Sequence, residues 1–160
     1  MLSRAALLCV MLCVGCITPE PASAPEQSAR TQQFLRVTQE VPAFGGLSRE
    51  NGQWVISLLD AGQREAAEAK LRDIFGEEAA GMTVRSRAPR GSASEELMRE
   101  ASAVLSGPGV GSVDFDETTG YIRVGLTDVE ALEPAQTQLE RHGIPLDQVI
   151  FEVVRPIVAL

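Results

Sequence analysis

The hydrophobic positions of the sequence alternate with other residues in two similar stretches, residues 45–60 and 111–128. Each stretch contains an alternating run, a polar turn with a glycine (Gly52 or Gly120), a second alternating run and a final aspartate. Alternation with a period of two is typical of a strand that is buried on one face, and a glycine turn between two such runs predicts a β-hairpin. An aspartate ahead of a helical pattern is a favourable N-cap. We therefore expect two hairpins, each followed by a helix.

Apolar residues at helical spacing occupy the segments around the hairpins, and two shorter apolar runs predict strands over residues 82–88 and 149–154. Proline is tolerated in the first turn of a helix and unfavourable in its interior, so Pro134 predicts either a short turn over 129–132 followed by the main helix or a kink. The predicted helices begin near these residues: Ser28, Asp60, Ser92 or Ser94, and Asp128.

The order helix, strand, strand, helix, strand therefore occurs twice. We interpret the chain as an α+β protein of two related helix-hairpin-helix-strand units, the first α/β unit over residues 28–91 and the second over 92–160. From residue 82 onward the order is β-α-β-β-α-β, which predicts a ferredoxin-like C-terminal part. The helices are expected on one face of the sheet. We expect apolar residues on the opposite, open face, which a second copy could cover: Val55, Leu59, Ile150 and Val154.

The net charge of −8 and the sequence pI near 4.7 argue against binding to nucleic acid, which needs a basic surface. The one basic cluster in the sequence consists of Arg85, Arg87 and Arg90. Guanidinium groups pair with carboxylates in a bidentate manner. The cluster either receives an acidic partner or prevents an edge strand from pairing with other chains.

The first residues have the pattern of a bacterial lipoprotein signal. Residues 1–15 contain one positive charge and then a short apolar run, and residues 13–16 resemble a lipobox that ends at Cys16. This predicts removal of the signal and lipid attachment at Cys16, with residues 16–27 as a tether rich in Pro, Ala, Ser and Glu. The resemblance implies a lipid-anchored protein of the cell envelope, in the outer membrane facing the periplasm or the cell surface. An ordinary secretory signal that is cut after Ala24 is the alternative.

The sequence contains no recognisable catalytic motif. All three cysteines lie in the first sixteen residues, and His142 is the only histidine. No Gly-x-Ser-x-Gly motif accompanies that histidine, and its place at a predicted helix end suits a structural role. The acidic residues near Asp116 do not follow the calcium-loop pattern. We therefore expect no enzymatic activity, no metal and no cofactor.

Several segments resemble the pro-regions of secreted serine proteases of the alpha-lytic and streptogrisin type. Those pro-regions are two-lobed folding catalysts and inhibitors of their own protease, so the resemblance implies a two-lobed α/β protein with a protease as partner. The sequence ends at Leu160 without a protease domain, so we expect a module that acts separately from one. The resemblance is carried by these segments: residues 44–46, 51–52, 82–105, 111–128, 150–154 and Pro156.

The same resemblance implies that the C-terminal tail, Ile157, Val158, Ala159 and Leu160, lies in the protease active site as a product does; alternatively, the tail only completes the last strand. We therefore expect a membrane-anchored, non-enzymatic binding module that inhibits an extracytoplasmic serine protease or assists its folding. The alternative is a structural lipoprotein of the envelope that oligomerises through its open sheet face.

Overall fold

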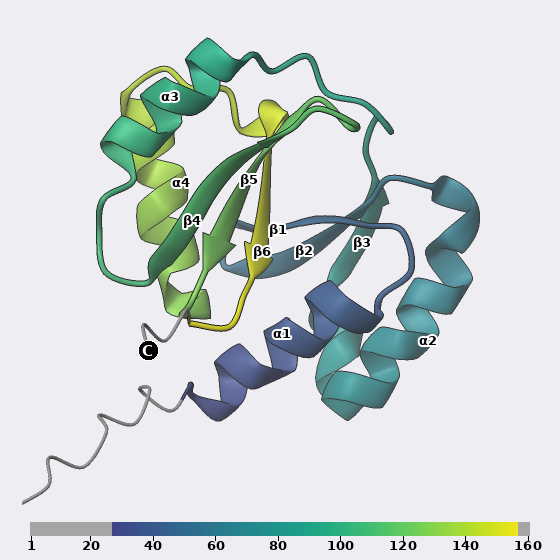
Figure 1. Ribbon diagram of the computed structural model, residues 1–160. Coiled ribbons are helices and arrows are strands. Elements are labelled where there is room, and N and C mark those ends of the chain that lie inside the picture. The colour runs from purple at the N-terminus through teal and green to yellow at the C-terminus, as the bar shows by residue number, and fades with distance from the viewer. Residues whose placement is uncertain (1–26, 157–160) are drawn as a thin grey trace, which may run out of the picture.

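The computed structural model of the protein describes residues 27–156 and contains a six-stranded mixed sheet with four α-helices, which confirms the α+β class (Figure 1). Among these residues, no helix combines the length and the hydropathy that crossing a bilayer would require. The helices are α1 (Ala29–Glu40), α2 (Arg64–Phe75), α3 (Glu95–Val104) and α4 (Leu132–Arg141). The strands are β1 (Phe44–Glu50), β2 (Gln53–Leu58), β3 (Thr83–Ser86), β4 (Val110–Asp116), β5 (Tyr121–Leu126) and β6 (Val149–Val153).

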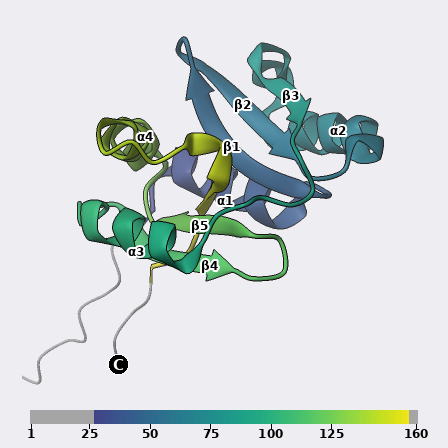
Figure 2. The ribbon, with the colours of Figure 1, turned by 90° about the horizontal axis from the view of Figure 1, so that it is seen from above.

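The strands follow the order β3-β2-β1-β6-β5-β4. Both expected hairpins are present as the antiparallel pairs β1–β2 and β4–β5, and β3 and β6 run parallel to β2 and β5. The two halves of the sheet meet where β1 and β6 run antiparallel, with Leu47 opposite Phe151 as the one registered pair. Figure 2 shows the strands of the two halves as two groups that meet at β1 and β6.

The expected ferredoxin-like order of the C-terminal part is wrong. In that arrangement β3 would join β4, β5 and β6 in one unit. Instead β3 lies at the opposite edge, with residues 83–86 in parallel register with residues 55–58 of β2, and β6 pairs directly with β5. The reason is the short crossover through α2, which returns the chain beside the strand that it has just left.

The helices cover one face of the sheet. Phe34 and Val37 of α1, Leu71 of α2 and Leu139 of α4 are all at most 1% exposed. They belong to one hydrophobic cluster together with Ala101 of α3 and the inward residues of the strands. Burial of a large aliphatic or aromatic side chain contributes about 1.5–3 kcal/mol, so this cluster holds the two halves together as one core.

Short 3-10 turns precede the second helix of each half. The Asp60 carboxylate accepts a hydrogen bond from the Gly62 N–H at 2.8 Å, and Asp128 accepts one from Glu130 at 3.1 Å. The α-helices begin only afterwards, at Arg64 and Leu132. Pro134 thus falls in the first turn of α4, where its missing N–H costs nothing. Of the two alternatives for this segment, the short turn before the main helix is confirmed.

The open face of the sheet exposes less apolar surface than the sequence predicts. Val55 and Ile150 are only 3% and 0% exposed, so the expected exposed apolar surface at these two positions is absent. Arg85 and Glu50, from the strands on either side of β2, form an ion pair that crosses the strand of Val55. Ile150 lies beside Gly46 and close to the guanidinium group of Arg87. The sequence pattern identified the outward positions but not the side chains that cover them.

Candidate functional site: an arginine-lined cavity

A cavity of about 410 Å³ lies at the junction of the two halves, where residues of β1 and β6 both contribute to its wall. All three arginines of the basic cluster line it. We call it the arginine cavity. Its wall consists of Leu47, Ser48, Glu50, Ser57, Arg85, Arg87, Ala88, Arg90, Gly91, Ser92, Tyr121, Gln136, Leu146, Asp147, Gln148, Val149 and Phe151.

Arg85 lies on the open face at β3. Its Nη2 atom is 2.7 Å from Oε1 of Glu50, and both side chains are 48% exposed. An ion pair with this exposure contributes at most about 1 kcal/mol to stability. Arg85 is therefore held in place weakly, and its guanidinium remains accessible from the cavity.

Arg87 is half-buried. Its Nη1 atom donates to the carbonyl oxygens of Gly45 and Val149, both at 3.0 Å, and its Nη2 donates to the carbonyl of Asp147 at 2.6 Å. The guanidinium carbon lies 4.5 Å from the centre of the Tyr121 ring. Arg87 thus joins β1, β5 and the start of β6, and it bridges the two halves of the molecule.

The segment that follows Arg87 runs along the upper end of the sheet toward α3 (Figure 1). The Tyr121 hydroxyl donates to the Ala88 carbonyl at 2.6 Å, and the Gly91 N–H donates to the Thr119 carbonyl at 2.8 Å. A Cβ atom at Gly91 would lie 2.4 Å from the carbonyl oxygen of Gly120, so only glycine fits here. This fixed segment carries Arg90 into the wall of the cavity.

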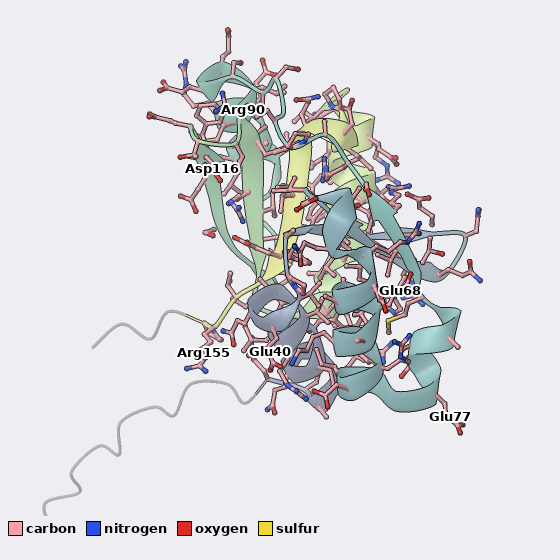
Figure 3. The ribbon with its side chains drawn as sticks, turned by 90° about the vertical axis from the view of Figure 1, so that its right-hand side faces the viewer. Glu40, Glu68, Glu77, Arg90, Asp116 and Arg155 are labelled. Carbon is pink, nitrogen blue, oxygen red and sulfur yellow. The ribbon has the colours of Figure 1, made fainter. Side chains whose placement is uncertain are left out.

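Arg90 is exposed, and within residues 27–156 it forms no ion pair. Figure 3 shows it at the end of the molecule that carries the β4–β5 turn, near Asp116. The alternative role of the cluster, protection of the β3 edge, stays a prediction: Arg85 is an exposed charge on that edge strand, and the guanidinium of Arg64 donates to the Val84 carbonyl of the same strand.

The wall also contains a polar group without a partner. The Oγ atom of Ser48 is buried and has no hydrogen-bond partner among the described residues. A buried hydroxyl without a partner costs about 1–3 kcal/mol, so native proteins rarely retain one without a reason. Sequence reasoning missed Ser48 because a serine at an outward strand position carries no distinguishing signal.

A second arginine on the open face was also missed. Arg123 of β5 pairs with Asp116 at 3.0 Å and with Glu152 at 2.8 Å. Contact with the Thr119 hydroxyl, the Arg123 guanidinium and two backbone N–H groups outweighs partial burial and lowers the pKa of Asp116 to about 2. The single guanidinium charge of Arg123 is thus neutralised by two carboxylates of the same chain, in contrast to Arg90 of the arginine cavity.

Cys16 and the tail residues Ile157, Val158, Ala159 and Leu160 lie outside the described residues. The chain leads to the tail through β6, which is buried, and then through Val154, whose N–H donates to the Leu126 carbonyl at 2.8 Å. Arg155 after it is exposed.

The end of the described chain lies away from the arginine cavity. The cavity is lined by residues at the start of β6, whereas Arg155 follows its end, and at about 3.3 Å per residue the seven residues from Gln148 to Arg155 span roughly 23 Å. Figure 3 shows Arg90 in the upper part of the view and Arg155 in the lower part. The amide of Gln27 donates to the carbonyls of Thr127 and Val154, so the start of the described chain lies beside the end of β6.

His142 lies at the exposed C-terminal end of α4, as the sequence predicts. Within residues 27–156, no three His, Cys, Asp or Glu side chains are placed so that they could hold a metal ion. The cavity wall offers guanidinium, hydroxyl and amide groups, which can bind an anion, together with the carboxylates of Glu50 and Asp147. No family model and no curated protein matches this chain.

Proposed function

We propose that the chain is a non-enzymatic binding module of the bacterial cell envelope, held to the membrane through a lipid on Cys16. Its partner is an extracytoplasmic serine protease, the class that the sequence resemblance implies, and the module inhibits that protease or assists its folding. We also propose that its two halves derive from one duplicated helix-hairpin-helix-strand unit.

One observation carries the proposal: a rigid central strand ends at the surface and leads directly into the apolar tail. β6 is paired on both sides, and its last residue, Val153, is 1% exposed. Two residues later the chain is at the surface, at Arg155. Residues 157–160 therefore follow a firmly anchored strand, which lowers the entropic cost of presenting them to a cleft.

The membrane anchor fits the same end of the molecule. Gln27 marks the end of the tether and is bonded to the residues that surround the end of β6. A lipid on Cys16 would be separated from this end by the eleven tether residues 17–27. A protease bound to residues 157–160 would therefore lie beside the membrane. The cavity with Arg85, Arg87 and Arg90 is lined by residues at the start of β6, away from this end.

The alternative, oligomerisation through the open face, has little support. The two most central apolar residues of that face, Val55 and Ile150, are buried under the chain's own polar side chains. A self-association surface needs accessible apolar area.

The experiment is an inhibition and refolding assay with the secreted serine proteases of the organism that produces the chain. We expect the intact protein to inhibit one of them or to accelerate its refolding, and a variant that lacks residues 157–160 to lose that effect. A variant with Arg99→Gln, an exposed arginine on α3, is the matched control. If intact and shortened proteins are equally inert toward every protease, the proposal is wrong.

Fatty-acid labelling that disappears in Cys16→Ala tests the anchor.

A further inference from the structure

The arginine cavity has an uncompensated positive charge. Its wall contains three guanidinium groups and the carboxylates of Glu50 and Asp147, which leaves one net positive charge. Glu50 is engaged by Arg85. Arg87 and Arg90 form no ion pair with any carboxylate of residues 27–156, because the bonds of Arg87 go to backbone carbonyls. This excess is unusual in a chain whose net charge is −8.

The cavity also presents hydrogen-bond donors from rigid positions. Arg87 is fixed by three carbonyls and the Tyr121 ring, so it cannot turn away to find an internal carboxylate. Arg90 follows on the segment that Gly91 holds against the β4–β5 turn. The Ser48 hydroxyl is an unused donor in the same wall. Fixed donors around an excess positive charge form a site for an anion.

The size and charge of the cavity restrict that anion. A volume of about 410 Å³ falls at the small end of ligand pockets, which range over roughly 300–1,000 Å³. One net positive charge balances one carboxylate, whereas a phosphate monoester carries about −1.5 to −2 at pH 7. The acidic surface elsewhere repels extended polyanions.

We propose that the arginine cavity binds a single carboxylate group of a peptide, either an acidic side chain or a chain end, with Arg90 as the principal contact and Ser48 as an additional donor. This inference rests on the proposed function only in that the chain is a binding module, since the cavity is lined by residues at the start of β6 whereas Arg155 follows the end of that strand.

The test is a titration of the full chain, labelled with nitrogen-15 in detergent micelles, with blocked tripeptides. The four probes are acetyl-Ala-Glu-Ala-amide, its Gln counterpart, its phosphoserine counterpart, and acetyl-Ala-Ala-Ala with a free carboxyl end. We expect saturable shifts of backbone N–H signals along the cavity wall with a carboxylate peptide and none with the Gln peptide. The Glu and free-end probes distinguish a side chain from a chain end as the source of the carboxylate.

Variants locate the contact. Arg90→Gln should weaken binding of the carboxylate peptide by at least about tenfold, because a charge-assisted hydrogen bond is lost, whereas Arg99→Gln on α3 should change it by no more than about twofold. Ser48→Ala should weaken binding without lowering the unfolding midpoint of the free protein, because the hydroxyl has no internal partner. If Ser48 served only stability, Ser48→Ala would lower the unfolding midpoint and leave peptide binding unchanged.

The inference is overturned if no carboxylate peptide shows saturable binding or if the Glu and Gln peptides bind with equal affinity. It is also overturned if the phosphoserine peptide binds most tightly, or if Arg90→Gln and Arg99→Gln change the affinity for the carboxylate peptide equally. The protease assay separates the two proposals. An Arg90→Gln protein that loses the peptide but still acts on the protease leaves both standing as independent sites. A shortened protein that binds the peptide while no protease responds to the intact chain removes only the proposed function.

Discussion

Arg87 is the side chain whose removal should weaken the joint between the two halves most clearly. In Arg87→Ala, the carbonyls of Gly45 and Val149 lose their donor in a partly buried place, at a cost of about 1 kcal/mol each. Loss of the stacking on Tyr121 adds about 0.5–2 kcal/mol. The bond to Asp147 is exposed and adds little. The free energy of unfolding should therefore fall by about 2–4 kcal/mol.

The assay is urea denaturation followed by the fluorescence of Trp54, the single tryptophan, which is 8% exposed in the folded protein. With a urea dependence of about 2 kcal/mol per M, the midpoint should fall by about 1–2 M. Arg85→Ala is the matched control, because it removes an exposed ion pair from the same cluster and should cost less than about 1 kcal/mol. Equal midpoints for the Arg85 and Arg87 variants would refute the bridging role.

Three further predictions concern stability. The folded pKa of Asp116, about 2, lies below its ordinary value of 3.8, so the stability that its carboxylate contributes is present above about pH 4 and is lost as the pH falls toward 2. Asp116→Asn should therefore lower the free energy of unfolding by about 1–2 kcal/mol at pH 7 and by much less at pH 2, as measured by urea titration. An equal loss at both pH values would contradict this. Gly91→Ala should cost about 1–3 kcal/mol because its Cβ meets Gly120, whereas Gly81→Ala, with open space around it, should leave the unfolding midpoint nearly unchanged; similar midpoints would disprove the steric argument. Ser94→Ala should cost about 1 kcal/mol, measured as a lower thermal midpoint, because its hydroxyl caps α3, and an unchanged midpoint would show that the cap is not needed.

The local elements could be predicted because their signals are local. Gly52 and Gly120 occupy the two hairpin turns with positive φ, and Pro134 limits where α4 can begin. The order of strands could not be predicted in the same way. Both β2 and β5 could pair with β3, and the alternation of residues in β3 is compatible with either pairing.

The site could be predicted only in part. The arginines are close in sequence, so their cluster was visible, and the structure brings all three to one cavity. Their roles differ because their partners lie far away in the sequence. Arg87 donates to the carbonyls of Gly45 and Val149, whereas Arg90 pairs with no carboxylate within residues 27–156. Ser48 joins the same wall from the first hairpin, without any local signal.

The most direct test of the proposed function is photocrosslinking in living cells of the organism that produces the chain. A benzophenone amino acid replaces Val158 in the tail, and in a control it replaces Glu77, an exposed residue beyond the end of α2. The account predicts a lipid-anchored adduct that contains a secreted serine protease for the tail probe and not for the Glu77 probe. If both probes give the same products, or if the tail probe gives no protease adduct while the protein is exported and folded, the account is contradicted.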